Sequence, residues 1–322
     1  MAESDGLQTN GAVQTVSTAT DGAADSRCTD SLTEDDTQPI LLADVLAAAP
    51  LTHLRVGMLT DVGRVREKNE DNLLAMHASG VFVVADGMGG HSSGEVASRL
   101  AIESIRAFYE HEATDSMLQA AYKAYLGRRK KGQPRRVFDE FRLWKAIEAA
   151  NLHIYNTAQQ HEQFRDMGTT VVAVHLVRSR MYIGHVGDSR VYRIRNGRMV
   201  QLTEDHSLAN EYVKMKILRK EDLPRFPYKN VIVRALGLQD HVQIDTFYRE
   251  AKAGDIFLLC SDGLTDLVED RDIHTIIDTS ASPTEACQRL VDEANARGGV
   301  DNITALIVEI GQNASKITKR RT

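Results

Sequence analysis

The sequence predicts a mixed α+β fold, because two different hydrophobic periodicities follow one another along the chain. Residues 93–109 and much of 111–160 carry apolar side chains three and four positions apart, which indicates amphipathic helices. From Gly168 onward, short runs rich in β-branched residues alternate with turns, and the pair Asn196-Gly197 is expected to close a tight hairpin. Strands joined by such turns run antiparallel. We therefore expect an antiparallel meander combined with long helices.

The individual elements can be assigned in chain order from the same two periodicities. A helix that begins at Ser93 has a serine available as its cap, and the last helix should close at Gly298-Gly299. The segment between Glu204 and Gly237 contains two prolines and is expected to be irregular, with one helical stretch. The expected strands are 54–60, 81–85, 170–177, 181–186, 191–194, 199–202, 242–248, 256–260 and 303–310, and the later helices are 270–278 and 283–297.

The composition excludes several classes of function. The chain has 322 residues, of which 42% are hydrophobic, so it can bury a sizeable core. Its net charge of −6 argues against a general nucleic-acid binder. No apolar run approaches the roughly 18 residues of a membrane span. Three cysteines without a Cys-x-x-Cys spacing predict neither a disulfide framework nor a thiolate zinc site. We see no secretory signal and expect a cytoplasmic monomer.

The chain is expected to divide into three regions. Residues 1–50 are rich in Ser, Thr, Asp, Gly and Ala, which predicts a disordered tail with one short helix over 40–49. Residues 51–312 should form the folded domain, and 313–322 a basic tail that frays. Within the domain, 127–136 is a basic insert between helices. We expect it to be solvated, and docking of an acidic partner is the alternative.

The most informative stretch runs from Val81 to His91. Its apolar, β-branched start indicates a buried strand that ends on Asp86, and three glycines follow within four positions. Taken alone, this pattern is typical of an ordinary turn. A turn so poor in side chains also lets backbone carbonyls approach a small cation, for which Asp86 supplies negative charge. The stretch therefore raises the hypothesis of a cation site.

Two further acids stand at comparable points of the chain. Asp262 ends a second strand, and Asp301 comes shortly before the last strand. If these strands are neighbours in one core, the three carboxylates converge and repel one another unless a cation neutralises them. Oxygen ligands without a cluster of His or Cys favour Mg²⁺ or Mn²⁺ over zinc. Such ions make bound water acidic and neutralise a phosphoryl group.

Six short motifs in a fixed order give the chain a family resemblance. Each is weak alone, but together they span residues 54–310. They are Arg66-x-x-x-Glu70-Asp71, Asp86-Gly87-Met88-Gly89-Gly90, Gly168-Thr169-Thr170, Gly187-Asp188-Ser189-Arg190, Ser261-Asp262-Gly263 and Asp301-Asn302. With these motifs the chain resembles the metal-dependent Ser/Thr protein phosphatases of the type 2C (PPM) family, in their bacterial form.

The resemblance implies both a fold and a metal centre. The fold would be a four-layer α/β/β/α sandwich, with two central antiparallel sheets flanked by helices, which agrees with the mixture of strands and helices above. Two Mn²⁺ or Mg²⁺ ions would be bridged by Asp86. The carbonyl of Gly87 would bind one ion, and Asp262 and Asp301 would complete the shell of the other.

The same resemblance implies the roles of two residues in the first motif. Glu70 would act through a metal-bound water. Arg66 would grip the substrate phosphate, a role that suits a bidentate guanidinium. The hydroxide held between the two metals would attack phosphorus in line, without a covalent enzyme intermediate.

The sequence departs from the family pattern at the expected general acid. Animal members carry a histidine directly after the metal-binding glycine, where this chain has Met88. His91, three residues on, is a candidate acid. Bacterial relatives can hold a third ion with an Asp near the Gly-Thr-Thr motif, for which Asp166 is the candidate. The region 205–235 corresponds to a variable flap that could help to select substrates.

The remaining motif residues are expected to be structural. We predict that Asp188 and Arg190 hold a turn by hydrogen bonds, because turn residues commonly bond to the backbone. Thr169 and Thr170 are expected to pack as strand residues.

The function implied is hydrolysis of phosphoserine and phosphothreonine in proteins, opposing a Ser/Thr kinase. Two alternatives stay open. A catalytically inactive family member could serve as a regulatory binding module, although such a copy usually lacks at least one of the required acids. A phosphatase dedicated to a single anti-sigma-antagonist-like regulator would share the fold and chemistry, since motif residues report the chemistry and not the substrate.

Overall fold

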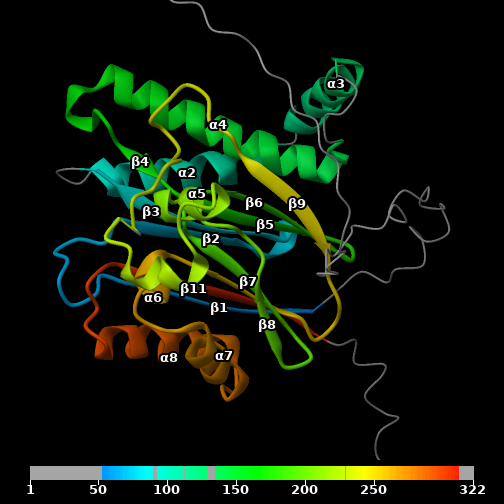
Figure 1. The fold of residues 1–322 in the computed structure, drawn as a ribbon. Helices are drawn as coiled ribbons and strands as arrows, with labels where there is room; N and C mark the ends of the chain where they lie inside the picture. The colour runs from blue at the N-terminus through cyan, green and yellow to red at the C-terminus, as the bar shows by residue number, and fades with distance from the viewer. Residues whose placement is uncertain (1–52, 90–92, 112, 129–134, 229, 312–322) are drawn as a thin grey trace, which may run out of the picture. The chain divides into compact units, whose positions relative to one another are not determined.

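Figure 1 shows a computed structural model of the chain, which describes residues 53–89, 93–111, 113–128, 135–228 and 230–311. All of them belong to the unit that spans Ala47–Thr322. The expected N-terminal tail with its short helix, most of the basic insert, the C-terminal tail and His91 lie outside the described residues.

Six of the described strands form one antiparallel sheet. Its order is β2-β3-β5-β6-β9, and the two-residue strand β4 pairs with the end of β3. Neighbouring strands in the order are antiparallel throughout. The strands are β2 (Asp71–Met76), β3 (Val81–Met88), β4 (Gly168–Thr169), β5 (Val171–Val177), β6 (Arg180–Val186) and β9 (Asp245–Glu250).

A five-stranded antiparallel sheet lies against the first one. Its order is β1-β11-β10-β7-β8, so the last strand of the chain pairs with the first described strand along its whole length. The predicted hairpin joins β7 to β8, and Asn196 and Gly197 have the positive φ values, 52° and 69°, that this turn requires. The strands are β1 (Leu54–Asp61), β7 (Arg190–Arg195), β8 (Arg198–Gln201), β10 (Ile256–Cys260) and β11 (Ile303–Ile310).

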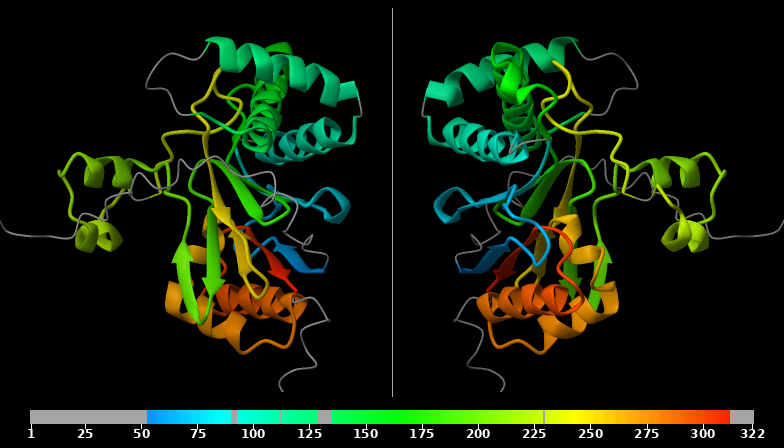
Figure 2. Two further views of the ribbon diagram at one scale, coloured as in Figure 1. Left: turned by 90° about the vertical axis from the view of Figure 1, so that its right-hand side faces the viewer. Right: turned by 90° about the vertical axis from the view of Figure 1, so that its left-hand side faces the viewer.

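Helices cover the outer face of each sheet, as Figures 1 and 2 show. On the six-stranded sheet lie α2 (Ser93–Glu110) and α4 (Phe138–Gln160), and α3 (Ala113–Arg128) precedes α4. On the five-stranded sheet lie α7 (Asp270–Asp278) and α8 (Pro283–Ala296), whose first residue is a proline after the capping Ser282. The layers therefore run helix, sheet, sheet, helix, and the four-layer α/β/β/α sandwich is confirmed.

The alternation of side chains along β3 explains why its sequence is apolar throughout. Val81, Val83 and Ala85 pack under α2 and α4, whereas Phe82 and Val84 enter the core between the two sheets. All five are fully buried, because a strand covered on both faces has no solvent side. Burial of each large apolar side chain contributes roughly 1.5–3 kcal/mol. The run that places Asp86 is thus anchored from both sides.

Three elements differ from the expectation. β2 was not predicted, because Asp71–Met76 shows no clear alternation. β3 does not end at Asp86 but continues to Met88, since Gly87 and Met88 pair with Thr169 and Gly168. Asp262 does not end a strand, because β10 ends at Cys260 and Asp262 is the first residue of a short helix, α6 (Asp262–Thr265). Asp86 is therefore held inside a strand and not in a loose turn.

Residues 205–235 form a flap that projects from the sheets, visible in yellow-green in Figure 2. It contains α5 (Leu208–Lys214) and the 3-10 helix η4 (Lys220–Arg225), in keeping with an irregular segment. Its two ends meet in a β-bridge between Ser207 and Ile232. Among the described helices, none is long and apolar enough to cross a lipid bilayer.

One residue of the basic insert is not solvated as expected. The Arg136 guanidinium donates from Nε to Thr246 Oγ1 at 2.8 Å and lies 5.0 Å from the centre of the Trp144 ring. This end of the insert is therefore held against β9 and α4.

Candidate active site

Five aspartates from distant segments gather where β2, β3, β6, α6 and β11 meet, and we refer to Asp71, Asp86, Asp188, Asp262 and Asp301 as the acidic centre. Asp71 and Asp86 are directly paired across β2 and β3. Burial, and then the charges of Asp71, Asp262, Asp188 and Asp301, raise the pKa of Asp86 well above its usual range. Burial, and then the charge of Asp188, raise the pKa of Asp262 in the same way. The structure thus brings together the three acids singled out in the sequence and adds two more.

The donor set fits a divalent cation. Asp71 Oδ2 accepts hydrogen bonds from Ser261 Oγ at 2.8 Å and Thr304 Oγ1 at 2.7 Å. Among the described residues, Asp71 Oδ1 and Asp188 Oδ1 are buried without a hydrogen-bond partner. Buried carboxylate oxygens need a compensating charge, and a set made only of oxygens suits Mg²⁺ or Mn²⁺. The residues present therefore fit the ions that the resemblance implies.

Gly87 and Gly94 let β3 and the start of α2 approach each other closely. A Cβ on Gly87 would lie 2.1 Å from the Gly94 carbonyl oxygen and 2.6 Å from the Glu70 carbonyl oxygen. A Cβ on Gly94 would lie 2.7 Å from Glu70 Oε2. No side chain fits at either position, so glycine is required for packing as well as for any approach of the Gly87 carbonyl to an ion.

The Gly-Thr-Thr motif fixes the backbone of Asp86. Thr169 Oγ1 donates to the Asp86 carbonyl oxygen at 2.8 Å, and the Thr170 amide donates to the same oxygen at 2.8 Å. The Asp86 amide in turn donates to Thr170 Oγ1 at 3.2 Å. The expectation that these threonines only pack was incomplete, because they position the central carboxylate of the acidic centre.

Asn302 holds the loop that carries Arg66 and Glu70. Its Nδ2 donates to the carbonyl oxygens of Val62 at 3.0 Å and Lys68 at 2.9 Å, and its Oδ1 accepts from the Glu70 amide at 2.8 Å. An asparagine can make all three bonds because its amide offers two donors and an acceptor. The Asp-Asn motif thus supplies a carboxylate to the acidic centre and a clamp for the first motif.

Arg66 and Glu70 lie at the edge of the acidic centre. Arg66 Nη2 donates to Asp301 Oδ2 at 2.8 Å, and about half of the Arg66 side chain is exposed. An exposed ion pair of this kind contributes little to stability, so a phosphate group can compete for the guanidinium. Burial raises the pKa of Glu70, which the neighbouring Arg66 charge partly offsets.

The prediction that Asp188 and Arg190 hold their turn by hydrogen bonds is wrong for Arg190, whereas the Asp188 carboxyl does bond to its own backbone. The Asp188 carboxyl belongs to the acidic centre, because its charge raises the pKa of Asp86 and Asp262. Burial, and then the charge of Asp205, raise the pKa of Asp188 itself to about 7. Arg190 instead binds Asp205 at the start of the flap, from Nε at 3.0 Å and from Nη2 at 2.7 Å. One signal was available in the sequence, because Asp188 follows a buried strand as Asp86 and Asp262 do.

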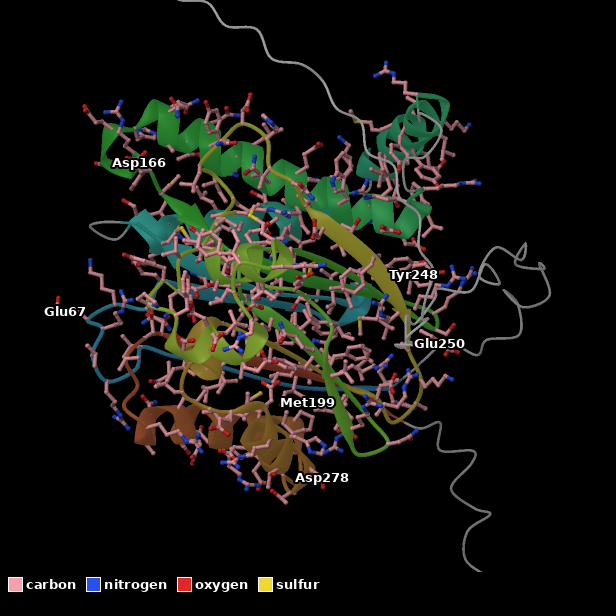
Figure 3. The ribbon with its side chains drawn as sticks, in the orientation of Figure 1. Glu67, Asp166, Met199, Tyr248, Glu250 and Asp278 are labelled. Atoms are coloured by element: carbon pink, nitrogen blue, oxygen red, sulfur yellow. The ribbon has the colours of Figure 1, made fainter. Side chains whose placement is uncertain are left out.

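Two candidate site residues, Asp166 and His91, are not placed in the acidic centre by any contact of the described residues. Asp166 is exposed and has a positive φ of 61°, and Figure 3 shows it at the same end of the sheets as Glu67, whereas Tyr248 and Glu250 lie at the opposite end. A role for Asp166 with a third ion stays a prediction. His91, the candidate acid, lies outside the described residues.

The buried Asp71 gives the metal-free protein a pH dependence of known sign. Burial raises its pKa from 3.8 to about 6. A raised carboxyl pKa means that the folded state binds the proton more tightly. Its contribution to stability is complete below the unfolded pKa and is lost as the pH rises through the folded pKa.

We therefore expect Asp71→Asn to flatten this dependence. In chelator, the variant should gain about 2.5 kcal/mol relative to the wild type between pH 4 and pH 8, measured by urea unfolding. Asp278→Asn, a change at an exposed acid, is the matched control. Equal stability differences between variant and wild type at both pH values would show the prediction to be wrong.

Comparisons with known proteins agree on one family. The family described as protein phosphatase 2C matches residues 64–296. The serine/threonine phosphatase stp of Listeria welshimeri is 37% identical over 261 residues, which cover 78% of this chain and 93% of that protein. The crystal structure of the Mycobacterium tuberculosis phosphatase PstP/Ppp has a TM-score of 0.68 at 32% identity, covering 80% of this chain and 99% of that one. The PstP catalytic domain in complex with two manganese ions has a TM-score of 0.65 at 31% identity, with the same coverage.

The sandwich and these matches over most of the chain define its class, and the chain belongs to the protein phosphatase 2C (PPM) family. Within that family it is a serine/threonine protein phosphatase of the bacterial type. The resemblance carried by the six motifs is confirmed.

Proposed function

We propose that this phosphatase hydrolyses phosphoserine and phosphothreonine in proteins with two Mn²⁺ or Mg²⁺ ions held by the acidic centre, and that it opposes a Ser/Thr kinase. The observation that carries the proposal is the burial of several carboxylates against one another, with oxygens left unpaired. The manganese ions of PstP support the choice of ion and the number of ions.

In this proposal Asp86 would be shared by the two ions, the carbonyl of Gly87 would bind one, and Asp262 and Asp301 would complete the shell of the other. The ions would supply hydroxide near neutral pH and neutralise the phosphoryl oxygens, so that attack on phosphorus needs no covalent enzyme intermediate. The hydroxyls of Ser261 and Thr304, which donate to Asp71, hold its carboxylate in place opposite Asp86.

Two residues at the edge of the acidic centre would act on the substrate side. Arg66 would exchange its ion pair with Asp301 for a fork of hydrogen bonds to the substrate phosphate. Glu70, held by the Asn302 clamp, would act through water at the rim of the ion site. Asp166 would hold a third ion, and His91 would protonate the leaving oxygen.

We expect purified protein to hydrolyse a phosphothreonine peptide only when Mn²⁺ or Mg²⁺ is present. The measurement is release of inorganic phosphate, with and without excess chelator, and restoration by each ion in turn. Full activity in chelator would contradict the metal mechanism. Calorimetry that shows no binding of Mn²⁺ would instead favour the inactive regulatory module.

A second measurement separates a general phosphatase from one dedicated to a single regulator. A panel of phosphoproteins, including a phosphorylated anti-sigma-antagonist-like protein, would be compared by kcat/KM. Comparable values across the panel favour a broad role against a kinase system, whereas one strongly preferred substrate favours the dedicated enzyme.

A further inference from the structure

Two buried histidines and an aspartate form a cluster beside the acidic centre that none of the motifs includes. His185 on β6 and His206 at the start of the flap are 2% and 1% exposed, and their rings stack with centroids 4.4 Å apart. Asp245, opposite His185 on β9, completes the cluster. One ligand atom from each of the three residues lies within 4.8 Å of the others, a spacing that invites comparison with a metal site.

The hydrogen bonds of His206 argue against a metal ion in this cluster. Its Nδ1 accepts from the Gly187 amide at 3.1 Å, so the proton of the neutral ring is on Nε2 and that nitrogen has no lone pair to offer. Arg234 Nη1 lies 3.2 Å from Nε2, but arginine can only donate and Nε2 carries the proton, so Nη1 bonds to Asp245 Oδ1 at 3.4 Å and adds a positive charge to the cluster. Within the described residues, the cluster is better explained as a chain of hydrogen bonds.

That chain runs from Asp245 through His206 to the backbone of Gly187. His206 Nε2 donates to Asp245 Oδ2 at 3.2 Å, and this bond holds the pKa of Asp245 down at about 2. The Gly187 peptide is bound on both sides, since the His206 amide also donates to the Gly187 carbonyl oxygen at 2.9 Å. The Val233 amide donates to the His206 carbonyl oxygen at 2.9 Å. This bond joins the C-terminal end of the flap to His206 at its N-terminal end.

The backbone of Gly187 lies next to two residues that shape the acidic centre, Thr170 and Asp188. Its φ of 106° favours glycine, and a Cβ there would lie 2.6 Å from Cβ of Thr170, the residue that bonds the Asp86 amide. The next residue is Asp188, whose unpaired carboxylate oxygen lies in the acidic centre. A shift of the Gly187 peptide would therefore move the carboxyl of Asp188.

We propose that His206 is a positioning residue for the phosphatase reaction. Through Nδ1 it holds the amide of Gly187, the residue before Asp188, so that the Asp188 carboxyl stays in the acidic centre, and Asp245 selects the ring tautomer that makes this bond. This logic is the same as that of a carboxylate that orients a catalytic imidazole. The inference rests on the proposed metal function of the acidic centre.

Two substitutions of equal polarity separate the bond to Gly187 from the bond to Asp245. In His206→Asn the side-chain oxygen stands the same number of bonds from the backbone as Nδ1, so an acceptor for the Gly187 amide is kept. In His206→Gln the amide reaches toward the place of Nε2 and that acceptor is lost. We expect His206→Ala and His206→Gln to lower kcat on an aryl phosphate about 10–100-fold, and His206→Asn to recover most of it.

A second readout does not depend on turnover. Hydrogen exchange of the Gly187 amide, followed by nuclear magnetic resonance, should become faster in His206→Ala and His206→Gln and stay slow in His206→Asn. His175→Asn is the control, because His175 on β5 is similarly buried and contacts Tyr109 instead of Gly187. It should lower stability without changing kcat.

The possible results decide the proposal. Equal kcat and equal Gly187 exchange in the Gln and Asn variants would overturn it, and so would a nitrogen-15 spectrum that places the His206 proton on Nδ1 in the wild type. If the wild type shows no Mn²⁺-dependent turnover, the proposed function fails instead, and the exchange rates of Gly187 still test the bond.

Discussion

Asp86→Asn is expected to lower Mn²⁺-dependent turnover by about a thousandfold or more while making the metal-free protein more stable. The loss of activity follows from the central place of Asp86, which lies among four other aspartates whose charges raise its pKa. An asparagine of the same shape leaves the β3 backbone and its bonds to Thr169 and Thr170 intact. The variant therefore removes the charge without removing the fold.

The gain in stability follows from the electrostatics of the acidic centre when chelator keeps metal ions away. Burial and the neighbouring charges raise the pKa of Asp86 well above its usual range, so ionising it in the folded state is unfavourable. A neutral side chain relieves this at neutral pH, so we expect the variant to be more stable than the wild type in chelator. Mn²⁺ should stabilise the wild type strongly, because an ion that binds only the folded state adds to its stability.

Thermal unfolding with chelator and with Mn²⁺, combined with phosphate release, measures both effects. Glu250→Gln is the matched control, since Glu250 is an exposed acid at the opposite end of the sheets, as Figure 3 shows. It should change neither quantity. A metal-free Asp86→Asn protein that is less stable than the wild type would show that the carboxylates do not repel one another in the folded state.

The sequence predicted best those parts in which neighbouring residues decide the structure. The strand of β3 and the hairpin at Asn196-Gly197 follow from local periodicity and turn chemistry, and both are present. The family motifs extended the prediction to the four layers. β2 was not predicted, because Asp71–Met76 is stabilised by pairing with β3 and not by a hydrophobic pattern of its own. Local propensity is a weak guide to such a strand.

The parts that could not be predicted depend on contacts between distant segments. Asp188 was assigned to a turn because its local sequence is that of a turn, whereas its carboxyl is drawn into the acidic centre by the position of β6 beside β5. Asp245 and Gly187 both bond to His206 because β6 pairs with β9 and the two ends of the flap pair with each other. No spacing along the chain encodes such a meeting.

Gly94→Ala is the second change with a large expected effect. Two contributions of opposite sign decide its effect on the free energy of unfolding. Alanine in a helix is favoured over glycine by roughly 1 kcal/mol. The new Cβ, however, would lie 2.7 Å from Glu70 Oε2 and 2.8 Å from the Gly87 carbonyl carbon, and overpacking of this kind costs about 1–3 kcal/mol. Because one neighbour is backbone, we expect a net loss of about 1–2 kcal/mol. The displacement of Gly87 and Glu70 should also lower turnover about a hundredfold.

Gly127→Ala isolates the helix contribution. Gly127 lies near the end of α3, and a Cβ there would meet nothing within 4 Å. This variant should be as stable as the wild type or up to about 1 kcal/mol more stable, with unchanged kcat. Urea unfolding and turnover of the two variants, measured side by side, give the packing effect as their difference. If Gly94→Ala matched Gly127→Ala in both, the close approach of β3 and α2 would not be what positions Gly87 beside the acidic centre.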